Sequence, residues 1–94
     1  MLSTIPIDIS KIKSEDIDKE ILRAALIAEL DAINLYEEMA ALAKNKDIKT
    51  VLLDVAKEEK EHVGEFQTLL LLFDKEQGEE LKSGKEEVEE LIGK

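Results

Sequence analysis

Three observations on the amino-acid sequence predict an all-α fold. The 94 residues are rich in Ala, Leu, Glu and Lys, which favour helices, and they include no Trp, one Tyr, two Phe and one Pro. Apolar residues recur at spacings of three and four over two long segments. A short polar connection, Lys44 to Asp47, separates these segments, and a link this short makes two helices antiparallel. We therefore predict an antiparallel two-helix hairpin followed by a short C-terminal helix.

The first part of the chain is expected to be an arm followed by a helix. Residues 1–13 alternate apolar and polar side chains around Pro6, which predicts an extended arm lying on a neighbouring chain. A hairpin domain is expected at 14–82, where Ser14 is a suitable N-cap and acidic residues follow it. The first helix is then predicted to run to about Lys44.

The second helix and the tail follow from similar signals. The helical pattern restarts near Asp47 and continues to about Asp74. Residues 83–94 are acidic, and Gly84 interrupts the pattern just inside them. We expect a short third helix that gives way to a flexible linker, with 83–94 as a separate helix or linker segment.

Composition limits the classes of partner. The net charge is −10, from 23 acidic and 13 basic residues, which argues against nucleic acid and against an anionic membrane surface. The sequence has no cysteine, so a metal would have to be held by carboxylate oxygen and imidazole. Neither a secretion signal nor an apolar run long enough for a membrane is visible, which favours the cytoplasm. Abundant Glu and Lys without Cys are typical of a thermophile.

Polar residues interrupt the apolar face of each long helix. On the second helix, one face consists of Ile48, Leu52, Val55, Glu59, His62, Phe66, Leu69 and Phe73. On the first helix, one face consists of Leu22, Leu26, Glu29, Ile33, Tyr36 and Ala40. Glu29, Glu59 and His62 are thus ligand-type residues on surfaces that a helix normally buries. An ionised carboxylate buried without compensation costs several kcal/mol, and neither face carries a Lys or Arg.

A metal ion would compensate these acids, because it binds carboxylate oxygen and neutral imidazole together. Glu59 and His62 lie three residues apart on one helix, so both side chains can reach one ion. A Glu-x-x-His with a lone Glu is half of the ligand set of a carboxylate-bridged two-metal site in a four-helix bundle. The other half would come from a second copy, which predicts a two-fold dimer. Two alternatives to a metal site remain. The three residues could form a buried hydrogen-bonded cluster, or they could be polar residues that fix the register between packed helices.

The residues resemble a known family. Glu29 with Tyr36 seven residues later, followed by Glu59-x-x-His62 within EEKEH, is similar to the ferritin-like superfamily and most closely to the encapsulated ferritins. The resemblance covers roughly residues 18–81. It implies a half-ferritin hairpin that dimerises into a four-helix bundle, with dimers assembled into a ring-shaped decamer. It also implies a ferroxidase that works inside an encapsulin shell, in the cytoplasm, and in some archaea is fused to the front of the shell protein.

The resemblance assigns roles to individual residues. It implies that Glu29, Glu59 and His62 are the iron ligands of a di-iron centre at the dimer interface, with Tyr36 as a neighbour that orients a ligand carboxylate. Asp31 matches an acidic position through which iron enters. The sequence departs from the family at two positions nearby: Ala28 stands where relatives often have a second Glu, and Leu35 where they often have Trp.

Three functions from different classes follow from these features. The first is a ferroxidase that oxidises Fe²⁺ to Fe³⁺ with dioxygen and supplies iron for storage. The second is a rubrerythrin-like peroxide reductase, for which the absence of Cys requires a separate electron-relay protein. The third is a structural coiled-coil module with a buried polar seam, in which replacing Glu59 or His62 by Ala would stabilise the assembly or leave it unchanged.

Overall fold

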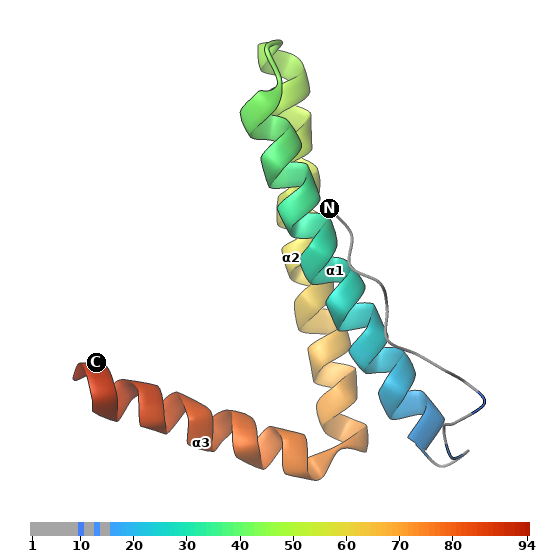
Figure 1. The fold of residues 1–94 in the computed structure, drawn as a ribbon, viewed down its shortest axis with the longest axis vertical. Helices are drawn as coiled ribbons and strands as arrows, with labels where there is room; N and C mark the ends of the chain where they lie inside the picture. The colour runs from blue at the N-terminus through green and yellow to red at the C-terminus, as the bar shows by residue number, and fades with distance from the viewer. Residues whose placement is uncertain (1–9, 11–12, 14–15) are drawn as a thin grey trace.

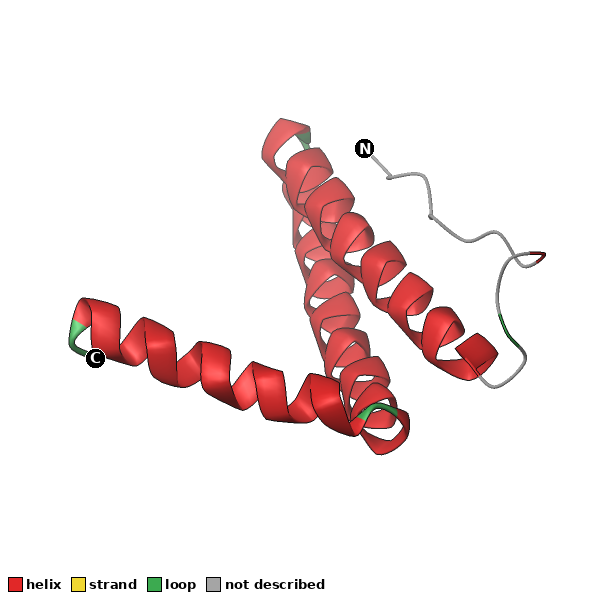
Figure 2. Ribbon diagram, turned by 60° about the horizontal axis from the view of Figure 1, so that its bottom comes forward, coloured by secondary structure: helices red, strands yellow, loops and turns green. Residues whose placement is uncertain are grey.

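The computed structural model describes residues 10, 13 and 16–94. This part of the chain forms three long helices, α1 (Ile17–Leu42), α2 (Lys46–Phe73) and α3 (Lys75–Ile92). Figure 2 shows that the described residues are helical except at short connections, and no strand occurs among them. The predicted all-α class is confirmed. The expected arm at 1–13 lies outside the described residues except for Ser10 and Lys13, and the division into domains stays a prediction.

The hairpin forms because both sides of the first connection are capped. The Ala43 backbone N–H donates to the Met39 carbonyl and closes α1. The Asn45 side-chain oxygen then accepts from the backbone N–H groups of Asp47 and Ile48, at 2.9 and 3.0 Å, and opens α2. With so short a link, the two helices run antiparallel side by side, as Figure 1 shows.

The ends of the first helix differ slightly from the sequence prediction. The helix begins at Ile17, and Asp16 occupies the cap position without a side-chain capping bond. The expected cap, Ser14, lies outside the described residues. The helix ends at Leu42 rather than near Lys44, because Ala43 turns to an extended conformation with φ −66° and ψ 134°. For α2 the expected bounds are correct to within one residue.

The third helix leaves the hairpin at Asp74 and extends away from it (Figure 1). The predicted interruption at Gly84 is wrong, since α3 continues unbroken from Lys75 to Ile92. A single glycine costs about 1 kcal/mol in a helix, which the surrounding Glu and Lys residues tolerate. The helix ends instead at Gly93, whose φ of 72° lies in the left-handed region that glycine adopts without strain.

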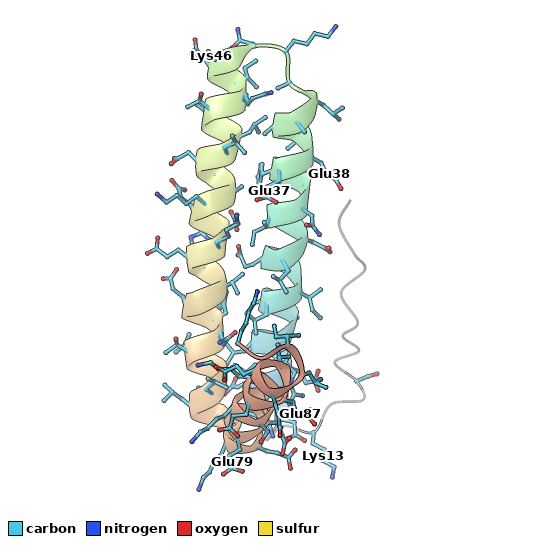
Figure 3. The ribbon with its side chains drawn as sticks, turned by 90° about the vertical axis from the view of Figure 1, so that its left-hand side faces the viewer. Lys13, Glu37, Glu38, Lys46, Glu79 and Glu87 are labelled. Atoms are coloured by element: carbon cyan, nitrogen blue, oxygen red, sulfur yellow. The ribbon has the colours of Figure 1, made fainter. Side chains whose placement is uncertain are left out.

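The molecule is elongated and flat and has little interior. Its extents are 47 × 43 × 19 Å, and its radius of gyration is 16.6 Å, whereas a compact chain of this length would have about 12 Å. In Figure 3, α3 points toward the viewer from the base of the hairpin and carries Glu79 and Glu87. Among the described residues only Ala40, Ala56 and Leu70 are buried hydrophobic residues. A single chain therefore leaves much of its apolar surface uncovered.

Within the described part of the chain, no helix is both long enough and apolar enough to cross a membrane.

Candidate metal centre

Glu29, Glu59 and His62 come together near the middle of the hairpin. Glu29 lies on α1, and the other two lie one turn apart on α2. One ligand-type atom from each residue falls within 4.8 Å of the other two. Among the described residues this is the one group of three or more such side chains. The structure thus brings together the three residues that the sequence predicts as ligands.

The imidazole lies between the two carboxylates. His62 Nδ1 is 3.3 Å from Glu59 Oε2, where the pair is hydrogen-bonded, and 3.4 Å from Glu29 Oε2. The Glu29 and Glu59 side chains are only 19% and 18% exposed, whereas that of His62 is 43% exposed. The centre is therefore closed on the side of the acids and open on the side of the imidazole. That open side is where a further ligand or a second chain has access.

One oxygen of the centre has no hydrogen-bond partner. Glu29 Oε2 is buried and unpaired in the described structure, because the nearby imidazole nitrogen is not aligned for a hydrogen bond to it. Leaving a charged acceptor unsatisfied costs more than about 1 to 3 kcal/mol. A cation bound between the three side chains would satisfy Glu29 Oε2, and carboxylate oxygen with imidazole nitrogen is a donor set that suits iron, zinc and manganese. The residues present therefore fit a metal ion.

The other predicted site residues are not part of this cluster. Tyr36 is half-buried on α1, two turns beyond Glu29, and within the described chain no hydrogen bond joins its hydroxyl to the three ligands. Asp31 lies on α1 about 200° around the helix from Glu29 and stands outside the converging group. The roles of Tyr36 and Asp31 stay predictions.

Sequence reasoning missed two ion pairs that join the helices. Lys60 Nζ lies 3.0 Å from Glu37 Oε2, and Arg23 Nη2 lies 2.6 Å from Asp74 Oδ2. Figure 3 shows Glu37 part-way along the hairpin. Both pairs link residues far apart in sequence, so helical spacing does not reveal them. The sequence holds one indication of the second pair. Arg23 is the single arginine of the chain, and it lies on the helix that packs against α2.

Comparisons with known proteins identify the family of this chain. The family model described as Rubrerythrin matches residues 20–92. The chain is 64% identical over 74 residues to a ferritin-like–encapsulin shell fusion protein of Pyrococcus furiosus, covering 79% of this chain and 21% of that protein. It is 40% identical over 65 residues to the encapsulin nanocompartment cargo protein EncC of Myxococcus xanthus, covering 69% of this chain and 50% of that protein. The chain thus spans half or less of the length of these two relatives.

A solved structure shows the same fold. The crystal structure of the encapsulated ferritin domain from Pyrococcus furiosus matches with a TM-score of 0.84 and 54% identity, covering 100% of this chain and 98% of that one. A helical hairpin that gathers two carboxylates and an imidazole between its helices defines a ferritin-like protein. The chain belongs to the rubrerythrin family of this class, and its predicted resemblance to the encapsulated ferritins is confirmed.

Proposed function

We propose that this protein is a ferroxidase, which oxidises Fe²⁺ to Fe³⁺ with dioxygen at a site formed by Glu29, Glu59 and His62. The observation that carries the proposal is the convergence of these three side chains around a buried carboxylate oxygen that has no hydrogen-bond partner within the described part of the chain. Ferrous iron is the substrate as well as the bound ion. Two ferrous ions supply two electrons, which with two protons reduce one dioxygen to hydrogen peroxide.

The side chains contribute charge, geometry and an open position. Glu59 has two carboxylate oxygens and would offer one to each of two ions, while Glu29 and His62 would each supply one further ligand. Two carboxylates with less than a fifth of their side-chain surface exposed favour the more highly charged ferric product over the ferrous substrate. The exposed edge of His62 leaves room for dioxygen and for release of the product. The two protons that the reduction of dioxygen consumes can come from solvent, so the site needs no further side chain to transfer them.

The proposed site is shared between two copies of the chain. A complete two-metal site of this class uses two Glu residues and two Glu-x-x-His pairs, and one chain has half of each set. The open imidazole side and the nearly coreless hairpin both support association. We propose an obligatory two-fold dimer that binds about one iron per chain, with further assembly into the ring-shaped decamer that the resemblance implies.

The relatives support a partner for this assembly. One is described as a fusion of a ferritin-like part to an encapsulin shell, and the other as an encapsulin cargo protein. We propose that this protein supplies ferric iron for storage inside an encapsulin compartment in the cytoplasm, whether fused to the shell or packaged by it. The negative charge of the chain suits a protein that attracts metal cations.

An anaerobic titration with Fe²⁺ followed by native mass spectrometry tests the site. Iron is expected on dimers or larger species, at about one ion per chain, and absent from monomers. Admission of dioxygen should then produce a rapid rise in ferric absorbance in the parent and no rapid phase in Glu29→Ala. Saturation of monomers with iron, or full activity of Glu29→Ala, would contradict the shared site.

A peroxide reductase is the second candidate, because the family whose model matches is named for rubrerythrin. The two functions differ in the oxidant that the reduced site prefers. Comparing the oxidation rates of the iron-loaded protein with hydrogen peroxide and with dioxygen separates them. Rapid turnover with peroxide and slow turnover with dioxygen would favour the reductase.

A further inference from the structure

Two alanines are the most deeply covered residues of the hairpin. Within the described part of the chain the buried hydrophobic residues are Ala40, Ala56 and Leu70, and the two alanines are each only 2% exposed. Ala40 lies on α1 and Ala56 lies on α2. At Ala56 the helix beside α2 is α1, because α3 joins α2 at its far end (Figure 1). The packing of α1 against α2 therefore closes over this small side chain.

The two alanines differ in their distance from the metal centre. Ala56 precedes Glu59 by three residues, which places it about 4.5 Å away along the axis of α2 and about 60° around the helix. Ala40 follows Glu29 by eleven residues, which places it about 16 Å away along the axis of α1. Ala56 thus lies within one turn of a ligand, whereas Ala40 lies three turns from the nearest ligand on its helix.

The contacts of the His62 imidazole show why the space between the helices matters. Glu59 Oε2 is 3.3 Å from His62 Nδ1, and this distance is set within α2, since the two residues are three apart on that helix. Glu29 Oε2 is 3.4 Å from the same nitrogen but belongs to α1. The second distance therefore depends on how closely the two helices approach each other.

Helix spacing in turn depends on the size of the side chains between the helices. Packed helix axes lie about 8 to 10 Å apart, according to the side chains at the contact. The distances between a metal ion and its ligands tolerate changes of only about 0.2 Å. A bulky side chain at the level of Glu59 would therefore move Glu29 out of reach of an ion that Glu59 and His62 hold, because a close-packed contact has no room to absorb it.

We propose that Ala56 is a positioning residue for the metal centre, whose small side chain lets α1 approach α2 closely enough for Glu29 to share an ion with Glu59 and His62. This proposal rests on the proposed binding of metal by these three residues. A methyl group has no donor atom, so Ala56 acts through the spacing of the helices. Because Ala56 is covered within a single chain, it acts on the hairpin itself and not on a contact between two copies.

Titration of the full chain with Co²⁺ tests the proposal. Cobalt follows iron in the order of affinities for such donor sets, and its visible absorption reports the number of ligands. Ala56→Leu and Ala40→Leu are a matched pair, since both positions are 2% exposed and leucine is close to alanine in helix propensity. We expect Ala56→Leu to weaken Co²⁺ binding by about tenfold or more, the usual cost of disturbing the support of a ligand. Ala40→Leu should bind within about twofold of the parent.

A double variant shows whether Ala56 acts through Glu29. Glu29→Ala already lacks the interhelical ligand, so adding Ala56→Leu to it should leave the Co²⁺ affinity within about twofold of Glu29→Ala alone. For the same reason, the absorption spectrum of Co²⁺ bound to Ala56→Leu should match that of Glu29→Ala. A residue that only stabilised the fold would give neither result.

Smaller substitutions keep the test valid if Ala56→Leu does not fold. Ala56→Val adds less bulk and should weaken Co²⁺ binding by about threefold or more. Ala56→Gly adds none, so it should bind Co²⁺ within about twofold of the parent although it lowers the urea midpoint of the metal-free protein. Circular dichroism establishes that each variant is helical before it is titrated.

The outcomes separate this proposal from the proposed function. Co²⁺ affinity near that of the parent in the folded Ala56→Leu or Ala56→Val variant would overturn the positioning role alone. Equal weakening in Ala40→Leu, or a further tenfold loss in the double variant, would also overturn it, because Ala56 would then act on the fold in general. Failure of the parent itself to bind Co²⁺ would reject the metal centre and the proposed function with it.

Discussion

Arg23 and Asp74 form an ion pair that ties the first helix to the junction between the second and third, with Arg23 Nη2 2.6 Å from Asp74 Oδ2. Asp74 is only 12% exposed and serves both helices that meet there. Its backbone N–H donates to the Leu70 carbonyl at the end of α2, and its Oδ1 accepts from the Gln77 backbone N–H at the start of α3. One side chain thus holds the direction in which α3 leaves the hairpin.

Asp74→Ala is therefore expected to loosen α3 without unfolding the hairpin. The substitution removes the ion pair and the cap of α3 together, whereas α1 and α2 keep their mutual contacts. Spin labels are attached at Glu58→Cys on α2 and Glu90→Cys on α3, and the doubly labelled chain is diluted with unlabelled chain. The distribution of distances between the two labels should be at least twofold broader in Asp74→Ala than in the parent. Glu37→Ala, which breaks the other interhelical ion pair, is the control and should leave the distribution unchanged. An unchanged distribution in Asp74→Ala would refute the role of this residue.

The Asp74 carboxyl group should also make the stability of the fold depend on pH in the acidic range. The hydrogen bond from the Gln77 backbone and the neighbouring Arg23 guanidinium hold the pKa of Asp74 below its ordinary value. The resulting stabilisation is complete above the ordinary carboxyl pKa of about 3.9 and is lost as the pH falls through the lower folded-state value. The difference in urea midpoint between the parent and Asp74→Asn should be constant from about pH 5 to 7 and shrink in stronger acid. A difference that grows in acid would have the wrong sign.

Glu29→Gln is expected to separate stability from metal binding. Without metal, the uncharged amide removes an unpaired buried carboxylate oxygen, so the melting temperature should stay the same or rise. With metal, the ligand charge is lost, so the rise in melting temperature that saturating Fe²⁺ gives the parent under anaerobic conditions should disappear. Glu37→Gln lies outside the cluster on α1 and should keep the response to Fe²⁺. A normal response in Glu29→Gln would remove Glu29 from the ligand set.

The two glycines near the end of the chain are expected to respond in opposite directions to alanine. A Cβ at Gly84 would meet nothing within 4 Å, and its φ is negative, so Gly84→Ala should stabilise α3 by about 0.5 to 1 kcal/mol. Gly93 has φ 72°, so Gly93→Ala forces a left-handed alanine and costs about 1 to 2 kcal/mol at the end of the helix. Helical content from circular dichroism, followed with temperature, measures both. Loss of helix in Gly84→Ala would show that another chain packs against this position.

The hairpin was predictable because its signals are local. The spacing of apolar residues defines two helices, and the short polar link between them makes them antiparallel. The failed prediction at Gly84 also has a local cause. The weak helix propensity of one glycine is outweighed by the run of good helix formers around it.

The ligand residues were predictable for a related reason. Two acids and an imidazole on apolar helical faces conflict with the pattern around them, and such a conflict indicates a functional group. Their mutual distances were not predictable, because the rotation and axial offset of α1 against α2 decide whether Glu29 reaches His62. The absence of a bond between Tyr36 and the ligands likewise depends on this packing.

The sequence by itself determined that the chain is helical, that it folds back on itself once, and that ligand-type residues interrupt the faces it would bury. Only the tertiary structure decided that Glu29, Glu59 and His62 meet at one point, that Glu29 Oε2 has no hydrogen-bond partner among the described residues, and that Asp74 joins three helices. The physical reason is the separation along the sequence over which the interactions act. Helix formation and capping depend on residues three or four positions apart, whereas a metal centre and an interhelical ion pair depend on how two rigid helices slide and turn against each other.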